Sequence, residues 1–133
     1  MIRPVQPPLA GTTILVVDDD PDIRQMIAAV LRAAGAEACE AADESSALDQ
    51  LDRQEVDAVL LDWHLAEGCG STLLETLCAR HPELSRRTAV ITGDLLRSTT
   101  DAIGNHPVLP KPFRPPELIA LIATMIERPS ECG

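Results

Sequence analysis

The stretch that decides the fold is residues 13–21, which read TILVVDDDP. Its first part, residues 13–17, is continuously apolar and rich in β-branched side chains, which predicts a strand buried on both faces. Asp20 followed by Pro21 predicts a helix start, because a carboxylate caps a helix N-terminus well and proline fits the first helical position. We therefore expect a buried strand that passes directly into a helix, with three carboxylates between them.

The alternation of strand and helix continues along the chain. Further strands are predicted at residues 36–41, 56–61, 88–92 and 108–109. Helices are predicted at residues 21–34 and 43–54, after residue 70, at residues 95–103, and from residue 115 to about residue 127. Five strands that alternate with helices favour an α/β fold with a parallel sheet and helices on both of its faces.

Apolar side chains at helical spacing predict the buried face of each helix. In the first helix this stripe comprises Ile23, Met26, Ile27, Val30, Leu31 and Ala34. In the second and third helices it comprises Ala47, Leu48, Leu51, Leu73, Leu74, Leu77 and Cys78. In the last helix it comprises Leu118, Leu121, Ile122 and Met125. Ile119 and Ile126 widen the last stripe, which leaves two interpretations open: a broad core face, or a surface for a partner or a homodimer.

Length and composition restrict the class of protein. The 133 residues suffice for one domain, which we place at residues 12–128, between an N-terminal tail or linker (residues 1–11) and a C-terminal tail (residues 129–133). A net charge of −10 disfavours direct binding of nucleic acid. Because the chain has neither a membrane-spanning apolar run nor a signal core, we expect a cytoplasmic protein whose four cysteines stay reduced.

Polar side chains follow four of the predicted strands at the points where those strands end. They are Asp18 and Asp19, Asp62, Thr92 and Lys111, the last being the only lysine of the chain. Since the carboxyl ends of parallel strands meet at one sheet edge, we expect these side chains to share a crevice. Carboxylates separated by ~4 Å repel one another by about 4 kcal/mol per pair, and an all-oxygen ligand set favours Mg²⁺. A carboxylate beside Mg²⁺ can attack phosphorus, while Thr92 and Lys111 can contact the phosphoryl oxygens.

Four segments, taken in order, resemble the bacterial response-regulator receiver domain. Residues 14–24 (ILVVDDDPDIR) are similar to the opening of that domain, and residues 60–65 (LLDWHL) with Gly70 are similar to its phosphoacceptor segment. Residues 89–93 (AVITG) resemble its hydroxyl segment, and residues 111–113 (KPF) its Lys-Pro-Phe. Each motif is weak alone, but four in order at family spacing are highly specific, and the resemblance extends over residues 13–127.

The resemblance implies a flavodoxin-like sheet of strand order 2-1-3-4-5. It implies that Asp62 accepts a phosphoryl group from a histidine kinase or a phosphotransfer protein. Asp19, Asp62 and the backbone carbonyl of His64 would bind Mg²⁺, and Asp18 would hold it directly or through water. Thr92 and Lys111 would contact the phosphoryl group, and Lys111–Pro112 would be a cis peptide. The resemblance implies that the chain is not an enzyme, except that it promotes its own phosphorylation and dephosphorylation. It also implies a domain that either stands alone or forms part of a hybrid kinase.

The sequence also departs from the family pattern. The aromatic residue usually found three positions before the lysine is Val108 here, and the usual proline after the phosphoacceptor is Ala66. A relay from Thr92 to an aromatic side chain is therefore not expected. His64 and Asp94 lie at positions that tune the phosphoryl lifetime in the family, and an exposed loop pair is the equally open alternative. Pro107 and Pro110 independently predict that the fifth strand lies at an edge, because proline cannot donate to a ladder.

Two other functions fit part of the pattern. In a haloacid-dehalogenase-like phosphatase, Asp18 would be the nucleophile and Asp20 the acid and base, which leaves Asp62 unexplained and lacks a further acidic pair after Lys111. A phosphorylation-independent interaction module is the other alternative, although the complete acceptor set argues against it.

Overall fold

The protein forms a five-stranded parallel sheet, seen in a computed structural model that describes residues 7–63, 71–93 and 106–127. The strand order β2-β1-β3-β4-β5 confirms the expected topology. The strands are β1 (Thr13–Val17), β2 (Glu37–Ala41), β3 (Ala58–Asp62), β4 (Thr88–Thr92) and β5 (Val108–Pro110). The described helices are α1 (Pro21–Ala33), α2 (Glu44–Arg53), α3 (Ser71–Arg80), α4 (Pro82–Ser85) and α6 (Pro115–Glu127). The helix expected at residues 95–103 lies outside the described residues.

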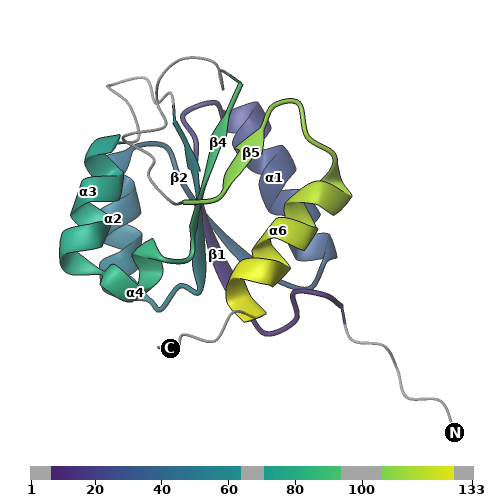
Figure 1. Cartoon of the computed structure of the whole chain (residues 1–133), viewed down its shortest axis with the longest axis horizontal. Coiled ribbons are helices and arrows are strands. Elements are labelled where there is room, and N and C mark those ends of the chain that lie inside the picture. Colours follow the sequence, from purple (N-terminus) through teal and green to yellow (C-terminus); the bar gives the residue numbers. More distant parts are fainter. Residues whose placement is uncertain (1–6, 64–70, 94–105, 128–133) are drawn as a thin grey trace, which may run out of the picture.

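Helices cover both faces of the sheet, as the alternation of strands and helices predicted. Helices α1 and α6 pack on one face, and α2, α3 and α4 pack on the other (Figure 1). Alternate residues of each central strand enter opposite clusters: Ile14 and Leu60 belong to the α1/α6 cluster, whereas Leu15 and Leu61 belong to the other. Strands β1, β3 and β4 are therefore apolar on both sides, which explains the continuous apolar runs of the sequence.

The start of α1 follows the local chemistry of its first residues. Asp20 is the N-cap, and its carboxylate accepts hydrogen bonds from the backbone N–H groups of Asp22 (2.9 Å) and Ile23 (3.4 Å). Pro21 occupies the first turn. This geometry confirms the predicted helix start, and it directs the chain out of β1 so that Asp18 and Asp19 stay at the sheet edge.

Two residues of the predicted apolar stripes lie on the solvent side. Met26 is 46% exposed, and Ala28, which the predicted stripe omitted, is fully buried. Because an α-helix has 3.6 residues per turn, Ala28 and Met26 point to different sides of α1, and the side that carries Ala28 faces the core. Cys78 of α3 is also exposed, with its Sγ 3.0 Å from the Ser85 hydroxyl. In α6, Ile119 and Ile126 are partly buried against the α1/α6 cluster, which favours the broad core face over the dimer surface.

Helix α4 was not predicted from the sequence, and the start of β3 was predicted two residues too early. Pro82 lies beyond the end of α3, where it opens the short α4. Strand β3 begins at Ala58 rather than at residue 56 and includes Asp62. Asp57 accounts for the later start, because its carboxylate accepts a 2.8 Å hydrogen bond from the Thr13 backbone N–H.

Residues 7–11, which we expected in a tail or linker, pack on the domain instead. Leu9 is 1% exposed and belongs to the α1/α6 cluster. Its backbone N–H donates a 2.8 Å hydrogen bond to the carbonyl of Ala34, just after α1. The Thr12 hydroxyl donates to the Leu9 carbonyl at 2.7 Å and so closes the turn. Residues 1–6 and 128–133, the remainder of both predicted tails, lie outside the described residues.

Strand β5 is the edge strand that its prolines predicted. Among the described strands its only partner is β4, with Val90 aligned to Val108 and Thr92 to Pro110. The backbone N–H of Val90 donates to the Pro107 carbonyl at 2.8 Å, and that of Lys111 donates to the Thr92 carbonyl at 2.9 Å. This pairing brings Lys111 to the carboxyl end of β4.

Candidate functional site

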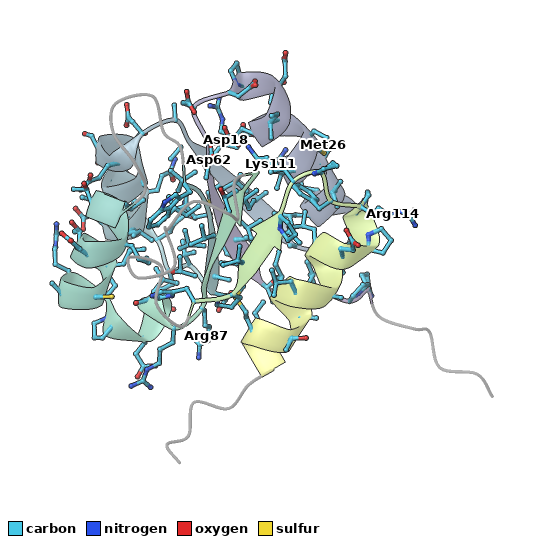
Figure 2. All side chains as sticks on the ribbon, turned by 45° about the horizontal axis from the view of Figure 1, so that its top comes forward. Asp18, Met26, Asp62, Arg87, Lys111 and Arg114 are labelled. Carbon is cyan, nitrogen blue, oxygen red and sulfur yellow. The ribbon has the colours of Figure 1, made fainter. Side chains whose placement is uncertain are left out.

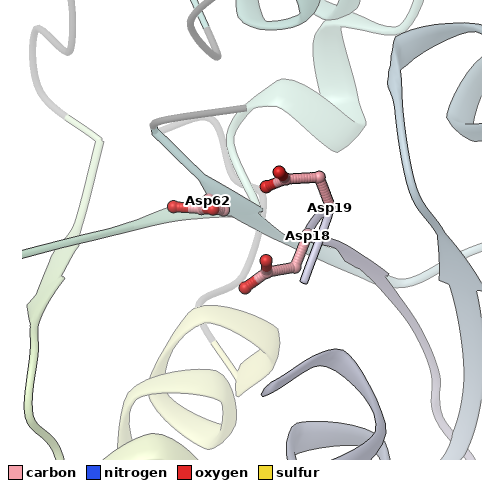
Figure 3. A group of neighbouring side chains, drawn as sticks. All are labelled: Asp18, Asp19 and Asp62. Atoms are coloured by element: carbon pink, nitrogen blue, oxygen red, sulfur yellow. The ribbon is translucent and has the colours of Figure 1, made fainter. Parts of the chain in front are cut away.

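Three carboxylates gather at the carboxyl ends of β1 and β3 (Figure 3). One carboxylate oxygen from each of Asp18, Asp19 and Asp62 lies within 4.8 Å of the other two. Asp18 is 1% exposed and Asp62 is 4% exposed, whereas Asp19 is more open to solvent. The sequence placed these residues at one edge of the sheet, and the structure brings their side chains together there.

The backbone around Asp18 is held by contacts on three sides. The Asp18 N–H donates to the Ala41 carbonyl of β2 at 3.0 Å, and Asp18 Oδ1 accepts from the Asp20 N–H at 2.9 Å. Nη1 of Arg24 donates to the Asp18 carbonyl at 2.9 Å, while Nε of Arg24 pairs with Glu40 at 3.0 Å. The position of the Asp18 carboxylate is therefore defined before any ligand arrives.

The environment of Asp18 disfavours its ionised form. Burial is the main cause that raises its pKa from 3.8 to about 6. The hydrogen bond from the Asp20 N–H and the charge of Lys111 lower the pKa, whereas the negative charges of Asp62 and Asp19 raise it. The second carboxylate oxygen, Oδ2, is buried and meets no hydrogen-bond partner among the described residues. A buried anionic oxygen without a donor is the arrangement that a bound cation would complete.

Lys111 and Thr92 join the carboxylates from the other side. Nζ of Lys111 lies 3.6 Å from Oδ1 of Asp62, and Figure 2 shows Asp18, Asp62 and Lys111 side by side. Thr92 ends β4 and is fully buried. The Lys111–Pro112 peptide is cis, as the resemblance implied. All five side chains named from the strand ends thus lie at one edge of the sheet.

The ligand set fits a hard divalent cation. Three carboxylates supply oxygen only, and Asp18 Oδ2 lacks a donor within the described part of the chain. Mg²⁺ prefers such oxygens and is usually bound by one or two carboxylates with water in the remaining positions. The backbone carbonyl of His64, the other ligand implied by the resemblance, lies outside the described residues, as do Ala66 and Asp94.

The geometry does not favour the phosphatase alternative. A phosphatase of that class would need Asp20 as a general acid and base near Asp18, but the Asp20 carboxylate caps the N-terminus of α1. It also leaves Asp62 without a role, whereas the structure places Asp62 among the carboxylates and beside Lys111.

Arg24 was not among the site residues predicted from the sequence, and Trp63 is a buried core residue next to the site. Arg24 supports the Asp18 backbone from α1, and only its position within the quoted opening motif could have marked it. Trp63, the only tryptophan, directly follows Asp62 and is 2% exposed. Val108, at the usual aromatic position, is partly buried against the cluster on the α2/α3/α4 face.

Comparisons with known proteins agree with the fold and the motifs. A family model for the response regulator receiver domain matches residues 14–123. PhoB of Escherichia coli (strain K12), the phosphate regulon transcriptional regulatory protein, is 34% identical over 120 residues, covering 86% of this chain and 52% of PhoB. A putative response regulator NtrX-like protein of Rickettsia bellii (strain RML369-C) is 34% identical over 119 residues, covering 86% of this chain and 24% of that protein.

Solved structures give the same assignment. A putative response regulator from Chloroflexus aurantiacus matches with a TM-score of 0.78 and 32% identity, covering 88% of this chain and 98% of that chain. The receiver domain of NtrX from Brucella abortus matches with a TM-score of 0.77 and 31% identity, covering 87% of this chain and 99% of that chain. The chain spans about half the length of PhoB. None of the helices in the described part combines the length and hydropathy that crossing a bilayer requires. The chain belongs to the response regulator receiver domain family.

Proposed function

We propose that Asp62 is the phosphoacceptor of this two-component receiver domain and that Asp18 and Asp19 complete its Mg²⁺ site. The observation that carries the proposal is the cluster of three carboxylates with Lys111 Nζ at 3.6 Å from Asp62. A lysine beside one member of an anionic cluster marks where a further negative group can be accommodated.

Asp62 is a better nucleophile than either neighbour. Asp18 Oδ1 accepts a 2.9 Å hydrogen bond from the Asp20 N–H, which makes that oxygen less available for attack. Asp19 is more open to water and follows Asp18 in the turn before α1. Asp62 ends a fully buried strand beside Lys111, so that an oxygen of its carboxylate is held in one place for attack.

The transfer step requires a phosphorylated donor and forms one bond while breaking another. An oxygen of Asp62 bonds to phosphorus, and the phosphorus–nitrogen bond of a donor phosphohistidine breaks, with the electron pair leaving on the imidazole nitrogen. Lys111 and Thr92 donate to the phosphoryl oxygens. A bound Mg²⁺ would neutralise charge on those oxygens and on the carboxylates.

The test is the mass of the intact protein after incubation with acetyl phosphate, with Mg²⁺ or with EDTA. The wild type should gain one phosphoryl group only with Mg²⁺, and Asp62→Asn should gain none. Asp49→Asn is the matched control, because Asp49 is exposed on α2 and should leave labelling unchanged.

An adduct that survives Asp62→Asn but disappears in Asp18→Asn would instead assign the nucleophile to Asp18. If wild type gains no adduct from acetyl phosphate or from a phosphorylated histidine phosphotransfer protein, the domain is either a phosphorylation-independent module or a receiver that accepts only from its cognate kinase. The first result, an adduct that survives Asp62→Asn, would reject Asp62 as the acceptor.

We propose that the donor is a histidine kinase or a phosphotransfer protein, because the family assignment and the acceptor geometry both suit a phosphohistidine.

PhoB is named as a transcriptional regulator, but this chain spans only about half of its length, so DNA binding is not assigned to this chain. A homodimer through α6 is still a prediction. Ile119 and Ile126 are partly buried against the α1/α6 cluster, which favours a core role for them over a dimer surface. Light scattering with and without phosphorylation tests it: a monomer in both states would reject the dimer.

A further inference from the structure

A recess lies at the end of the sheet opposite the carboxylate cluster. Its volume is about 420 Å³, and residues from α2, from the segment before β3, from α3 and from α4 to the start of β4 line it. Figure 2 shows Arg87, which lines the recess, at the far side of the molecule from Asp62 and Lys111. The recess is therefore separate from the proposed phosphoacceptor site.

Basic side chains line this recess without strong ion pairs. Among the described residues, Arg80 reaches only Asp52, at 3.9 Å, and Arg87 has no ion pair. Glu55 and Glu83 line the same recess, yet the described structure contains no ion pair between them and either arginine. The guanidinium groups therefore keep most of their donors available to a ligand.

His81 also lines the recess. Its backbone N–H donates to the Leu77 carbonyl at 2.7 Å, and its carbonyl accepts from the Ser85 N–H at 2.9 Å, which holds it between α3 and α4. Nε2 of its ring is buried and meets no hydrogen-bond partner among the described residues. His81 is therefore held in place where it lines the recess, and its ring can report on a bound ligand.

The charge of this corner differs from that of the rest of the chain. The protein has a net charge of −10, whereas in the recess the two arginines Arg80 and Arg87 balance the two glutamates Glu55 and Glu83. Leu51, Val56 and Leu84 add apolar surface to the recess. We propose that this recess binds a small molecule that carries a carboxylate or phosphate group on an apolar body.

The chemistry of the lining selects this class of ligand. Guanidinium groups recognise carboxylate and phosphate oxygens through paired N–H donors, and Arg80 and Arg87 both line the recess. The apolar body would cover Leu51, Val56 and Leu84, and the volume suits a ligand of that size. Glu55 and Glu83 oppose a polyanion, which argues against a nucleic acid and for a small molecule with a single anionic group.

The ring protons of the three histidines give a direct test by proton NMR, with His81→Gln identifying the His81 signals. Benzoate and phenyl phosphate are the anionic probes, and benzylamine carries the same ring with a positive charge. A saturable shift of the His81 signals with benzoate, phenyl phosphate or both, and none with benzylamine, supports the site. Which anion binds identifies the group recognised, and a response to neither, or an equal response to benzylamine, would overturn the proposal.

Variants separate this site from general charge effects. Arg87→Gln should weaken the binding of the responding probe by about tenfold or more, because a charge-assisted hydrogen bond is lost. Arg86→Gln is the matched control, because Arg86 is exposed beside Arg87 but does not line the recess. Lys111→Ala removes the cation at the other end of the sheet and should leave binding unchanged. Equal weakening by Arg86→Gln, or loss of binding in Lys111→Ala, would overturn the proposal.

Discussion

At the scale of single residues, Asp18 places a carboxyl group where water cannot reach it. It is 1% exposed, and burial is the main reason why its pKa rises from 3.8 to about 6. Since the folded protein binds this proton more tightly than the unfolded chain, Asp18 contributes stability below about pH 4 and loses that contribution as the pH rises through 6. Above pH 6, the ionised group therefore opposes folding in the absence of a cation.

Asp18→Asn should stabilise the metal-free protein at pH 8 and have a smaller effect at pH 5. Asparagine keeps an oxygen for the Asp20 N–H and carries no charge, so the expected gain at pH 8 is about 1–3 kcal/mol. Urea unfolding in EDTA at the two pH values measures it. Asp49→Asn, on the exposed face of α2, is the control, and an equal change at both pH values would contradict the explanation.

Arg24 makes a second residue-scale prediction. Arg24→Gln should weaken Mg²⁺ binding by about tenfold or more, because the Asp18 backbone loses the 2.9 Å contact that orients it. The fluorescence of Trp63, the only tryptophan and the neighbour of Asp62, can report the titration. Arg32→Gln is a matched control, since Arg32 also approaches Glu40, at 3.7 Å, but makes no contact with Asp18. Equal affinities in wild type and Arg24→Gln would reject this role.

At the scale of elements, the segment before β1 is joined to the end of α1. Leu9 enters the α1/α6 cluster, and the chain passes close to Gly35, whose φ is +100°. A Cβ on Gly35 would lie 2.6 Å from the Cβ of Pro7 and 3.1 Å from the backbone nitrogen of Ala10. Glycine at this helix end therefore serves both the left-handed backbone conformation and the packing of the segment.

Gly35→Ala should lower the free energy of unfolding by more than Gly11→Ala does. Both glycines have positive φ, so both substitutions cost about 1–2 kcal/mol of backbone strain. Only Gly35 has neighbours that a new Cβ would meet, since Gly11 has no atom within 4 Å of that position. The additional loss should be about 1 kcal/mol or more by urea unfolding. Equal losses would mean that residues 7–10 do not hold their place on α1.

At the scale of the whole molecule, an excess of ten negative charges opposes compaction. Sodium chloride should stabilise the protein modestly by screening, and Mg²⁺ at equal ionic strength should stabilise it further through the carboxylate site. At ten times its Kd, the specific part should be about 1.4 kcal/mol. Thermal unfolding measures both effects. The specific part should disappear in Asp62→Asn, and Mg²⁺ that stabilises that variant as much as wild type would contradict the site.

The sequence predicted most of what depends on neighbours along the chain. The apolar run at β1, the cap at Asp20 and the edge position of β5 agree with the structure, and so does the sheet order that the family resemblance implied. The convergence of Asp18, Asp62 and Lys111 also followed, because parallel strands bring their carboxyl ends to one edge. The spacing of apolar residues predicted the approximate buried face of each helix. The prediction was wrong at Met26, because α1 faces the core with Ala28 instead.

The sequence by itself determined the α/β topology and the identity of the residues at the strand ends, since strand, cap and turn preferences are local. Only the tertiary structure decided that Leu9 enters the core and that Asp18 Oδ2 is left without a described donor. It also decided that Arg80, His81 and Arg87 line a recess far from Asp62. These features depend on contacts between segments distant along the chain, whose packing geometry no local preference encodes.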